Sequence, residues 1–206
     1  MTATERAYAF TKGRVLDSTF AGGELITEGE VADALGLSRT PVREAFLRLE
    51  GEGLLRLYPK RGALVVPVSV GEVEAVMETR QLVERFALGK VLADGPAPAL
   101  ADELDAAIDT QVAAESPEAF VALDREFHTV FVTAARNPIV TGLYDSLRDR
   151  QRRMVITSLL RDAARMSSII VEHREIAAAV RDGDLVRAQD VLARHLEGTL
   201  ELLRRG

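Results

Sequence analysis

The 206-residue sequence contains no cysteine. This absence excludes disulfides, thiolate zinc sites and cysteine nucleophiles. No apolar run approaches the roughly 18 residues that a membrane-spanning helix needs. The N-terminal stretch MTATERAYAFTKGR mixes charged and polar residues and lacks the apolar core of a signal peptide. Together these absences predict a cytoplasmic protein that has no membrane partner.

Basic residues are outnumbered by acidic ones, and the formal net charge of -6 argues mildly against nucleic-acid binding. The charge is unevenly distributed, however. Residues 1–70 hold nine Lys/Arg and nine Asp/Glu, whereas residues 71–206 hold 17 Lys/Arg and 23 Asp/Glu. Residues 38–61 alone contain six basic residues and three acidic ones. Positive charge is therefore concentrated in one short segment.

Three short helices fit the first 55 residues. Apolar spacing predicts one helix that includes residues 8–16 and ends near Ser18. It predicts a second helix that includes residues 31–35 and stops at Gly36. The third helix is predicted to begin at Thr40-Pro41, with Thr40 as the N-cap and Pro41 as the first helical residue. A helix, a tight turn and another helix form the helix-turn-helix pattern.

Two short strands are predicted directly after the third helix. They cover residues 55–58 and 63–66, around a Pro59-Lys60-Arg61-Gly62 turn. A hairpin that follows a helix-turn-helix is a wing, and this wing carries two cations at its tip.

The arginines at the start of the third helix suit an anionic partner. Backbone N–H groups and the helix dipole favour an anion there, and Arg39 and Arg43 flank this end. One can hold a phosphate while the other reads a guanine edge in the major groove. The alternative is a solvated surface helix with Arg/Glu pairs at helical spacing. The basic residues of the wing favour DNA binding over the solvated surface helix.

This region resembles a known family. The segment GLSRTPVREAFLRLEGEGLL, followed by PKRGALV, is similar to the winged helix-turn-helix of GntR-family bacterial transcription regulators, over about residues 10–68. The resemblance implies double-stranded DNA as a partner. It also implies a set of DNA-contacting residues, namely Arg39, Thr40, Arg43, Lys60, Arg61 and Gly62.

The remainder of the chain is predicted to be helical. Residues 67–71 form a short linker, and no strand alternation follows. Breaks at Pro, Gly, Asn and Asp separate helices over about residues 72–93, 100–115, 117–135 and 138–160, one around Val171, and one over 184–203. The predicted fold is therefore mainly α, with an N-terminal winged helix-turn-helix (residues 1–68) followed by an all-α antiparallel helical bundle (residues 72–206).

All three histidines lie in the second region. Asp124 and His128 are four residues apart and share one helix face beside an apolar stripe. His173 and His195 also lie among apolar residues, so three helices can each direct an imidazole inward. One carboxylate and three imidazoles suit a divalent metal. The alternative is three unrelated histidines, each hydrogen-bonded in or near the core.

A second resemblance covers about residues 72–204. The segments ETRQLVE, LDREFHTVFVTAARNPIV and EHREIAAAVRDGDLVRAQDVLARHLE are similar to the FCD ligand-sensing domain of the FadR subfamily. Its D-x-x-x-H pattern with two further histidines implies metal ligands at Asp124, His128, His173 and His195. It also implies that Arg80 and Asn137 lie near an effector cavity.

Two alternatives concern arginines of this region. Arg80 can instead form a surface ion pair with Glu84. The run of Arg148, Arg150, Arg152 and Arg153 is interpreted as a solvated face, although one of the four can pair with an anionic ligand.

The leading interpretation is a ligand-responsive transcription regulator rather than an enzyme. We expect a homodimer on a two-fold operator, with repression as the family's commoner mode. A small carboxylate effector would complete the coordination of the metal, for which zinc is the first choice and nickel or manganese are alternatives. Three other functions remain open. They are a metal-responsive regulator, an architectural DNA-binding dimer with a structural metal, and a metal-dependent hydrolase.

Overall fold

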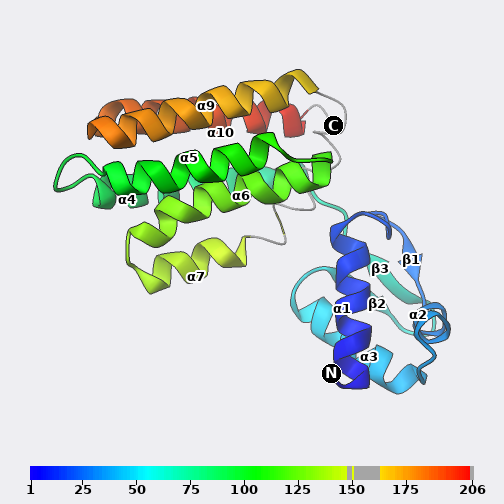
Figure 1. Ribbon diagram of the computed structural model, residues 1–206. Coiled ribbons are helices and arrows are strands. Elements are labelled where there is room, and N and C mark those ends of the chain that lie inside the picture. Colours follow the sequence, from blue (N-terminus) through cyan, green and yellow to red (C-terminus); the bar gives the residue numbers. More distant parts are fainter. Residues whose placement is uncertain (148–149, 151–162, 205–206) are drawn as a thin grey trace. The chain divides into compact units, whose positions relative to one another are not determined.

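The structure is a computed structural model that describes residues 1–147, 150 and 163–204 (Figure 1). It divides into two compact units, Met1–Ser69 and Val70–Gly206. The elements of the first unit are α1 (Ala3–Leu16), β1 (Leu25–Ile26), α2 (Glu28–Leu35), α3 (Arg39–Gly51), β2 (Leu55–Tyr58) and β3 (Gly62–Val65). Those of the second are α4 (Val70–Val91), α5 (Pro98–Val112), α6 (Pro117–Ala134), α7 (Pro138–Ser146), α9 (Ala163–Asp182) and α10 (Leu185–Arg204). Across these described ranges, no helix has both the length and the apolar character to cross a membrane.

The first unit is a winged helix-turn-helix, as the sequence predicts. α1 packs against α2 and α3, over a core that includes Val42, Phe46 and Leu49. β2 and β3 pair antiparallel as the predicted wing, with Tyr58 opposite Gly62. β1 adds a third strand on the free edge of β3, which the sequence analysis missed. Two residues are too few to show an alternating pattern.

The start of α3 differs from the prediction. The helix begins at Arg39 with Ser38 as its N-cap, so the placement of Thr40 as N-cap is wrong. Pro41 becomes the third helical residue instead of the first. Proline is tolerated there because the first four N–H groups of a helix have no acceptor within it. The end of α2 agrees with the prediction, since Gly36 is left-handed with a φ of 64°.

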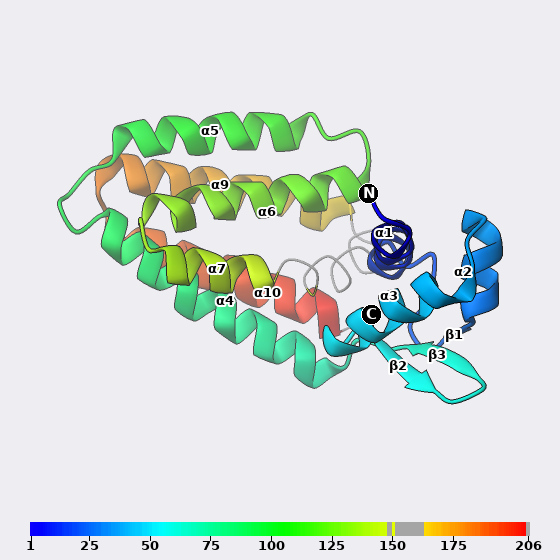
Figure 2. The same cartoon turned by 90° about the horizontal axis from the view of Figure 1, so that it is seen from below.

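The second unit is a helical bundle, also as predicted (Figures 1 and 2). Five helices form a ring in the order α4, α6, α5, α9 and α10, with α10 packing back on α4. Short connections make α5 and α6 antiparallel, and likewise α9 and α10. α7 packs against α6 and α4 from outside this ring. The interior is therefore lined by helices that are distant in sequence.

The helix predicted over residues 138–160 is wrong as one continuous element, because α7 ends at Ser146. The later part of this prediction lies outside the described residues, as do Arg148, Arg152 and Arg153. Arg150 is described. Its half-exposed guanidinium forms a 3.0 Å ion pair with Glu72, which fits the solvated-face interpretation.

Candidate metal centre and nucleic-acid interface

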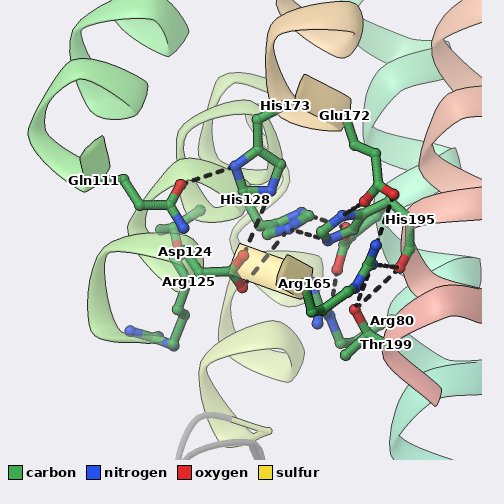
Figure 3. A network of polar contacts seen from close by, with 12 residues as sticks. Arg80, Gln111, Asp124, Arg125, His128, Arg165, Glu172, His173, His195 and Thr199 are labelled. Carbon is green, nitrogen blue, oxygen red and sulfur yellow. Dashed lines mark hydrogen bonds and ion pairs between the residues drawn. The ribbon is translucent and has the colours of Figure 1, made fainter. Parts of the chain in front are cut away.

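Four potential metal ligands converge inside the bundle from three helices (Figure 3). α6 carries Asp124 and His128 one turn apart, α9 carries His173, and α10 carries His195. The three imidazoles are at most 1% exposed. One ligand atom from each of the four residues lies within 4.8 Å of the others. The structure thus brings together the four residues of the predicted metal site.

The short distances in this group involve the Nε2 atoms of the imidazoles. His128 Nε2 lies 3.1 Å from His195 Nε2. Asp124 Oδ1 lies 3.5 Å from His173 Nε2, and Asp124 Oδ2 lies 4.0 Å from His128 Nε2. Three ring nitrogens and a carboxylate therefore face one another across a small buried space.

Each imidazole has a polar partner at its other ring nitrogen, Nδ1. The pairs are His128 with Glu84 (2.7 Å), His173 with Gln111 (2.9 Å) and His195 with Glu172 (2.8 Å). All three partners place an oxygen near Nδ1, in hydrogen-bonding geometry for His173 and His195 and at ion-pair distance for His128. When Nδ1 donates to such an oxygen, the Nε2 atom of the same ring keeps a lone pair that can bind a metal. Carboxylate and amide partners of this kind orient metal-binding histidines and make them more basic.

Glu84 connects the centre to two further buried side chains. Its Oε1 accepts hydrogen bonds from Arg80 Nε at 2.7 Å and from the Tyr144 hydroxyl at 3.0 Å. Burial alone would raise the pKa of Glu84, but the charge of Arg80 lowers it to about 2. The expected surface ion pair of Arg80 and Glu84 exists but is buried, with side chains 3% and 0% exposed. Arg80 and Glu84 belong to α4, and α4 packs against both α6 and α7.

The imidazoles of His173 and His195 are held in the state that binds metals. Burial, together with the charge that neighbouring histidines would carry, lowers the pKa of His173 well below its ordinary value. Burial also lowers the pKa of His195, against the opposing hydrogen bond to Glu172. Both rings are therefore neutral at pH 7, and a neutral imidazole can bind a metal without first losing a proton.

The residues present fit a divalent cation. Asp124 Oδ1 and His173 Nε2 are buried and have no hydrogen-bond partner among the described residues, which is costly unless another group satisfies them. His128 Nε2 and His195 Nε2 face each other at 3.1 Å. One oxygen and three nitrogens form a donor set suited to zinc, nickel or manganese. Phe127 stacks on His173 with ring centroids 3.8 Å apart and shields the group with an apolar wall.

Sequence reasoning missed the outer partners Gln111, Glu172 and Tyr144. Gln111 carried a weak signal, since it continues the buried stripe of Leu104 and Ile108 on α5. A polar residue in such a stripe requires a partner.

Asn137, the second residue expected near an effector, is the N-cap of α7. Its side-chain oxygen accepts hydrogen bonds from the backbone N–H groups of Ile139 and Val140. A contact of Asn137 with an effector stays a prediction.

The predicted DNA contacts lie in two exposed places on the first unit. Arg39, Thr40 and Arg43 occupy the first two turns of α3. Lys60 and Arg61 lie at the tip of the wing. Exposed cations at a helix start and on a hairpin tip form the arrangement that a major groove and its flanking phosphates require.

Gly62 has a structural reason to be glycine. Its φ is 112°, and a Cβ at this position would clash with the carbonyl oxygen of Ile26 on β1. A contact with DNA at Gly62 would therefore be made by its backbone, and it stays a prediction.

Comparisons with known proteins agree with this architecture. The model of the gntR family of bacterial regulatory proteins matches residues 3–65, and that of the FCD domain matches residues 75–198. A helix-turn-helix transcriptional regulator in an unstable DNA locus of Streptomyces ambofaciens is 30% identical over 96% of this chain and 84% of its own length. The galactonate operon transcriptional repressor of Escherichia coli is 25% identical over 79% of this chain and 80% of its own length. A GntR transcriptional regulator from Rhodococcus sp. RHA1 has the same fold, with a TM-score of 0.78 and 23% identity, over 100% of this chain and 99% of that one.

The chain therefore belongs to the GntR family of bacterial transcription regulators, carries an FCD domain, and is a DNA-binding transcriptional regulator.

Proposed function

We propose that the protein is a homodimeric repressor whose operator binding responds to a small organic acid bound at a divalent metal. Asp124, His128, His173 and His195 would hold the ion. The observation that carries this proposal is the convergence of four ligand atoms within 4.8 Å, with a polar partner at the Nδ1 atom of every imidazole. A bound cation supplies positive charge and open coordination positions to which a carboxylate can bind.

Arg80 supports an anionic effector. Its Nε is engaged by Glu84, whereas its Nη2 is buried and has no hydrogen-bond partner within the part of the chain that the structure describes. A buried guanidinium N–H without an acceptor is costly, and a carboxylate would satisfy it. The similarity to a galactonate operon repressor supports the same class, because galactonate is a hydroxycarboxylate. We therefore expect a hydroxy- or dicarboxylate that reaches both the metal and Arg80.

The effector would act by joining helices. Arg80 belongs to α4, whereas the metal ligands belong to α6, α9 and α10. A ligand that contacts both groups favours the arrangement of helices in which they are close. Its effect on operator affinity is limited by its differential affinity for the two arrangements, typically about 1–3 kcal/mol, or 5- to 150-fold.

Dimerisation would place two winged domains on a two-fold operator. α4 and α7 pack together and expose large apolar side chains, including Leu82, Phe86, Ile139 and Leu143. Apolar side chains on adjacent helices are typical of interfaces between subunits. In each subunit, Arg39, Thr40 and Arg43 would read bases, while Lys60, Arg61 and the backbone of Gly62 would contact phosphates.

The experiment compares wild-type protein with the His173→Ala variant. Metal content is measured by mass spectrometry. Affinity for DNA from upstream of the chain's own gene is measured with and without a panel of hydroxy- and dicarboxylates. We expect the variant to lose metal and response while its operator affinity without effector stays within about 2-fold of wild type. Ser167→Ala, at an exposed position on α9, serves as the control and should behave as wild type.

Two outcomes would change the interpretation. Full metal content and a normal response in His173→Ala would show that the four-residue site is wrong. A change in operator affinity on adding or removing zinc alone, with no further effect of any acid, would make the ion itself the signal.

A further inference from the structure

The first turn of α2 lies against both arginines at the start of α3. Arg43 Nε donates to Glu28 Oε1 at 2.8 Å. Next to Glu28, Gly29 lies against the guanidinium of Arg39, whose Nη2 would be in van der Waals contact, at 3.6 Å, with a Cβ at Gly29. The two arginines that are expected to contact DNA, Arg39 and Arg43, are thus both adjacent to the first turn of α2. No residue of this turn is among the predicted DNA contacts.

The carboxylate of Glu28 is not used to cap its own helix. Thr27 Oγ1 accepts from the Glu30 N–H, and Glu30 Oε2 accepts from the Thr27 N–H. These two residues form a complete capping box. Among the described residues, the Glu28 side chain pairs with Arg43. Glu28 is therefore available to act on Arg43.

The contact fixes how Arg43 presents its charge. The Arg43 side chain is 69% exposed, whereas that of Glu28 is 24% exposed, so the more buried residue holds the more exposed one. Because Nε is occupied, the edge with the two terminal nitrogens is the edge left for a ligand. That edge matches the O6 and N7 atoms of guanine. Holding the guanidinium in place before binding also reduces the entropy that Arg43 loses on binding.

Glu28 also carries a negative charge at a surface that meets phosphates. A carboxylate there opposes association with any DNA, whatever its sequence. At the operator the orientation of Arg43 outweighs this repulsion, whereas unrelated DNA meets the repulsion alone. The net effect of Glu28 therefore differs in sign between the two kinds of binding.

We propose that Glu28 is a positioning residue that determines operator specificity, by orienting Arg43 towards a guanine and by repelling DNA that offers none. This inference rests on the proposed base contact of Arg43, which the Arg43→Ala variant tests separately.

The experiment uses the full chain and a DNA sequence that the wild-type protein selects from a randomised pool, with a scrambled version of it as the non-specific probe. The variants are Glu28→Ala, Glu28→Gln, Arg43→Ala and the double variant. Glu44→Gln is the matched control, because it removes one negative charge from α3 at a residue that binds Thr4 instead of an arginine.

We expect Glu28→Ala to weaken operator binding about 3- to 10-fold and to strengthen binding to the scrambled DNA. Glu28→Gln should retain part of the specificity, since its amide oxygen can still accept from Nε. The control should strengthen both kinds of binding equally and leave their ratio unchanged. In the Arg43→Ala background, removing Glu28 should cause no further loss of operator selectivity.

Three results would overturn the proposal. The first is a ratio of operator affinity to scrambled-DNA affinity that Glu28→Ala leaves unchanged. The second is a change of this ratio in Glu44→Gln as large as that in Glu28→Ala. The third is a double variant that loses as much selectivity relative to Arg43→Ala as Glu28→Ala loses relative to wild type. If Arg43→Ala itself leaves the ratio unchanged, the proposed base contact fails, and the role of Glu28 fails with it. Thermal melting of each variant shows whether a loss of binding reflects loss of the fold.

Discussion

Replacing Glu84 by glutamine should destabilise the helical unit by about 3–5 kcal/mol, because it leaves a buried charge without its partner. The Arg80 side chain is 3% exposed, so its guanidinium cannot turn to water when Glu84 becomes neutral. The amide is close in size to the carboxylate, so packing changes little. It has a single acceptor oxygen, whereas the carboxylate serves Arg80, Tyr144 and His128 with two.

The same substitution should weaken metal binding. His128 loses the carboxylate that lies 2.7 Å from its Nδ1 and orients its ring. Loss of such an outer partner typically lowers metal affinity about 10- to 100-fold. We expect this loss for Glu84→Gln even under conditions in which the variant is fully folded.

The assay for stability is urea unfolding of metal-free protein, followed by circular dichroism. Metal affinity is measured by zinc titration against a competing chelator. Glu78→Gln, an exposed position on the same helix, should stay within about 0.5 kcal/mol of wild type. A double variant with Arg80→Met should recover part of the loss, because no unpaired charge remains. If Glu84→Gln unfolds at the wild-type midpoint and keeps its zinc affinity, the argument from burial is refuted.

Three further predictions follow from the interface, the exposed faces and the buried imidazoles. Lys60→Ala should weaken operator and unrelated DNA alike and reduce the salt slope by about one, as a phosphate contact does; a loss confined to the operator in salt titrations would contradict this. Leu82→Asp combined with Ile139→Asp should yield monomers in light scattering. The two side chains are 73% and 83% exposed in one subunit, so the substitutions would place charge in the proposed interface. Persistence of the dimer would show that it forms elsewhere. Metal-free protein should lose stability as the pH falls below about 6.5, because the folded state lowers the pKa of His173 and His195 and the unfolded chain takes up protons first. Zinc-loaded protein should resist this loss, and melting temperatures that do not change between pH 7 and 5 without metal would contradict it.

Much of the fold follows from local sequence signals. Gly36 ends α2 in a left-handed conformation. Ser116 and Asn137 cap α6 and α7, each directly before a proline. Such signals act within one helical turn, so they can be recognised without knowing what the helix packs against. The capping error at Thr40 has the same local origin, because Ser38 two residues earlier is an equally good cap by residue type.

The candidate site was partly predictable for the same reason. Asp124 and His128 share a helix face by spacing alone. No spacing connects them to His173 or His195, which lie on other helices. Their apolar surroundings made a shared metal site one of two alternatives, and the resemblance to a known family favoured it before the structure brought the four ligand atoms within 4.8 Å.

The tertiary structure alone decided which polar residues serve the centre and which face water. Arg80 and Glu84 form the same i, i+4 pair whether their helix is exposed or covered, and only the packing of the bundle around α4 makes this pair buried. Gln111 and Glu172 became partners of histidines, and Glu28 of Arg43, through contacts between helices. Helix periodicity, caps and charge are properties of neighbouring residues, so the sequence by itself determined them. Burial and pairing depend on which surfaces meet when the helices pack, so they are decided only when the chain folds.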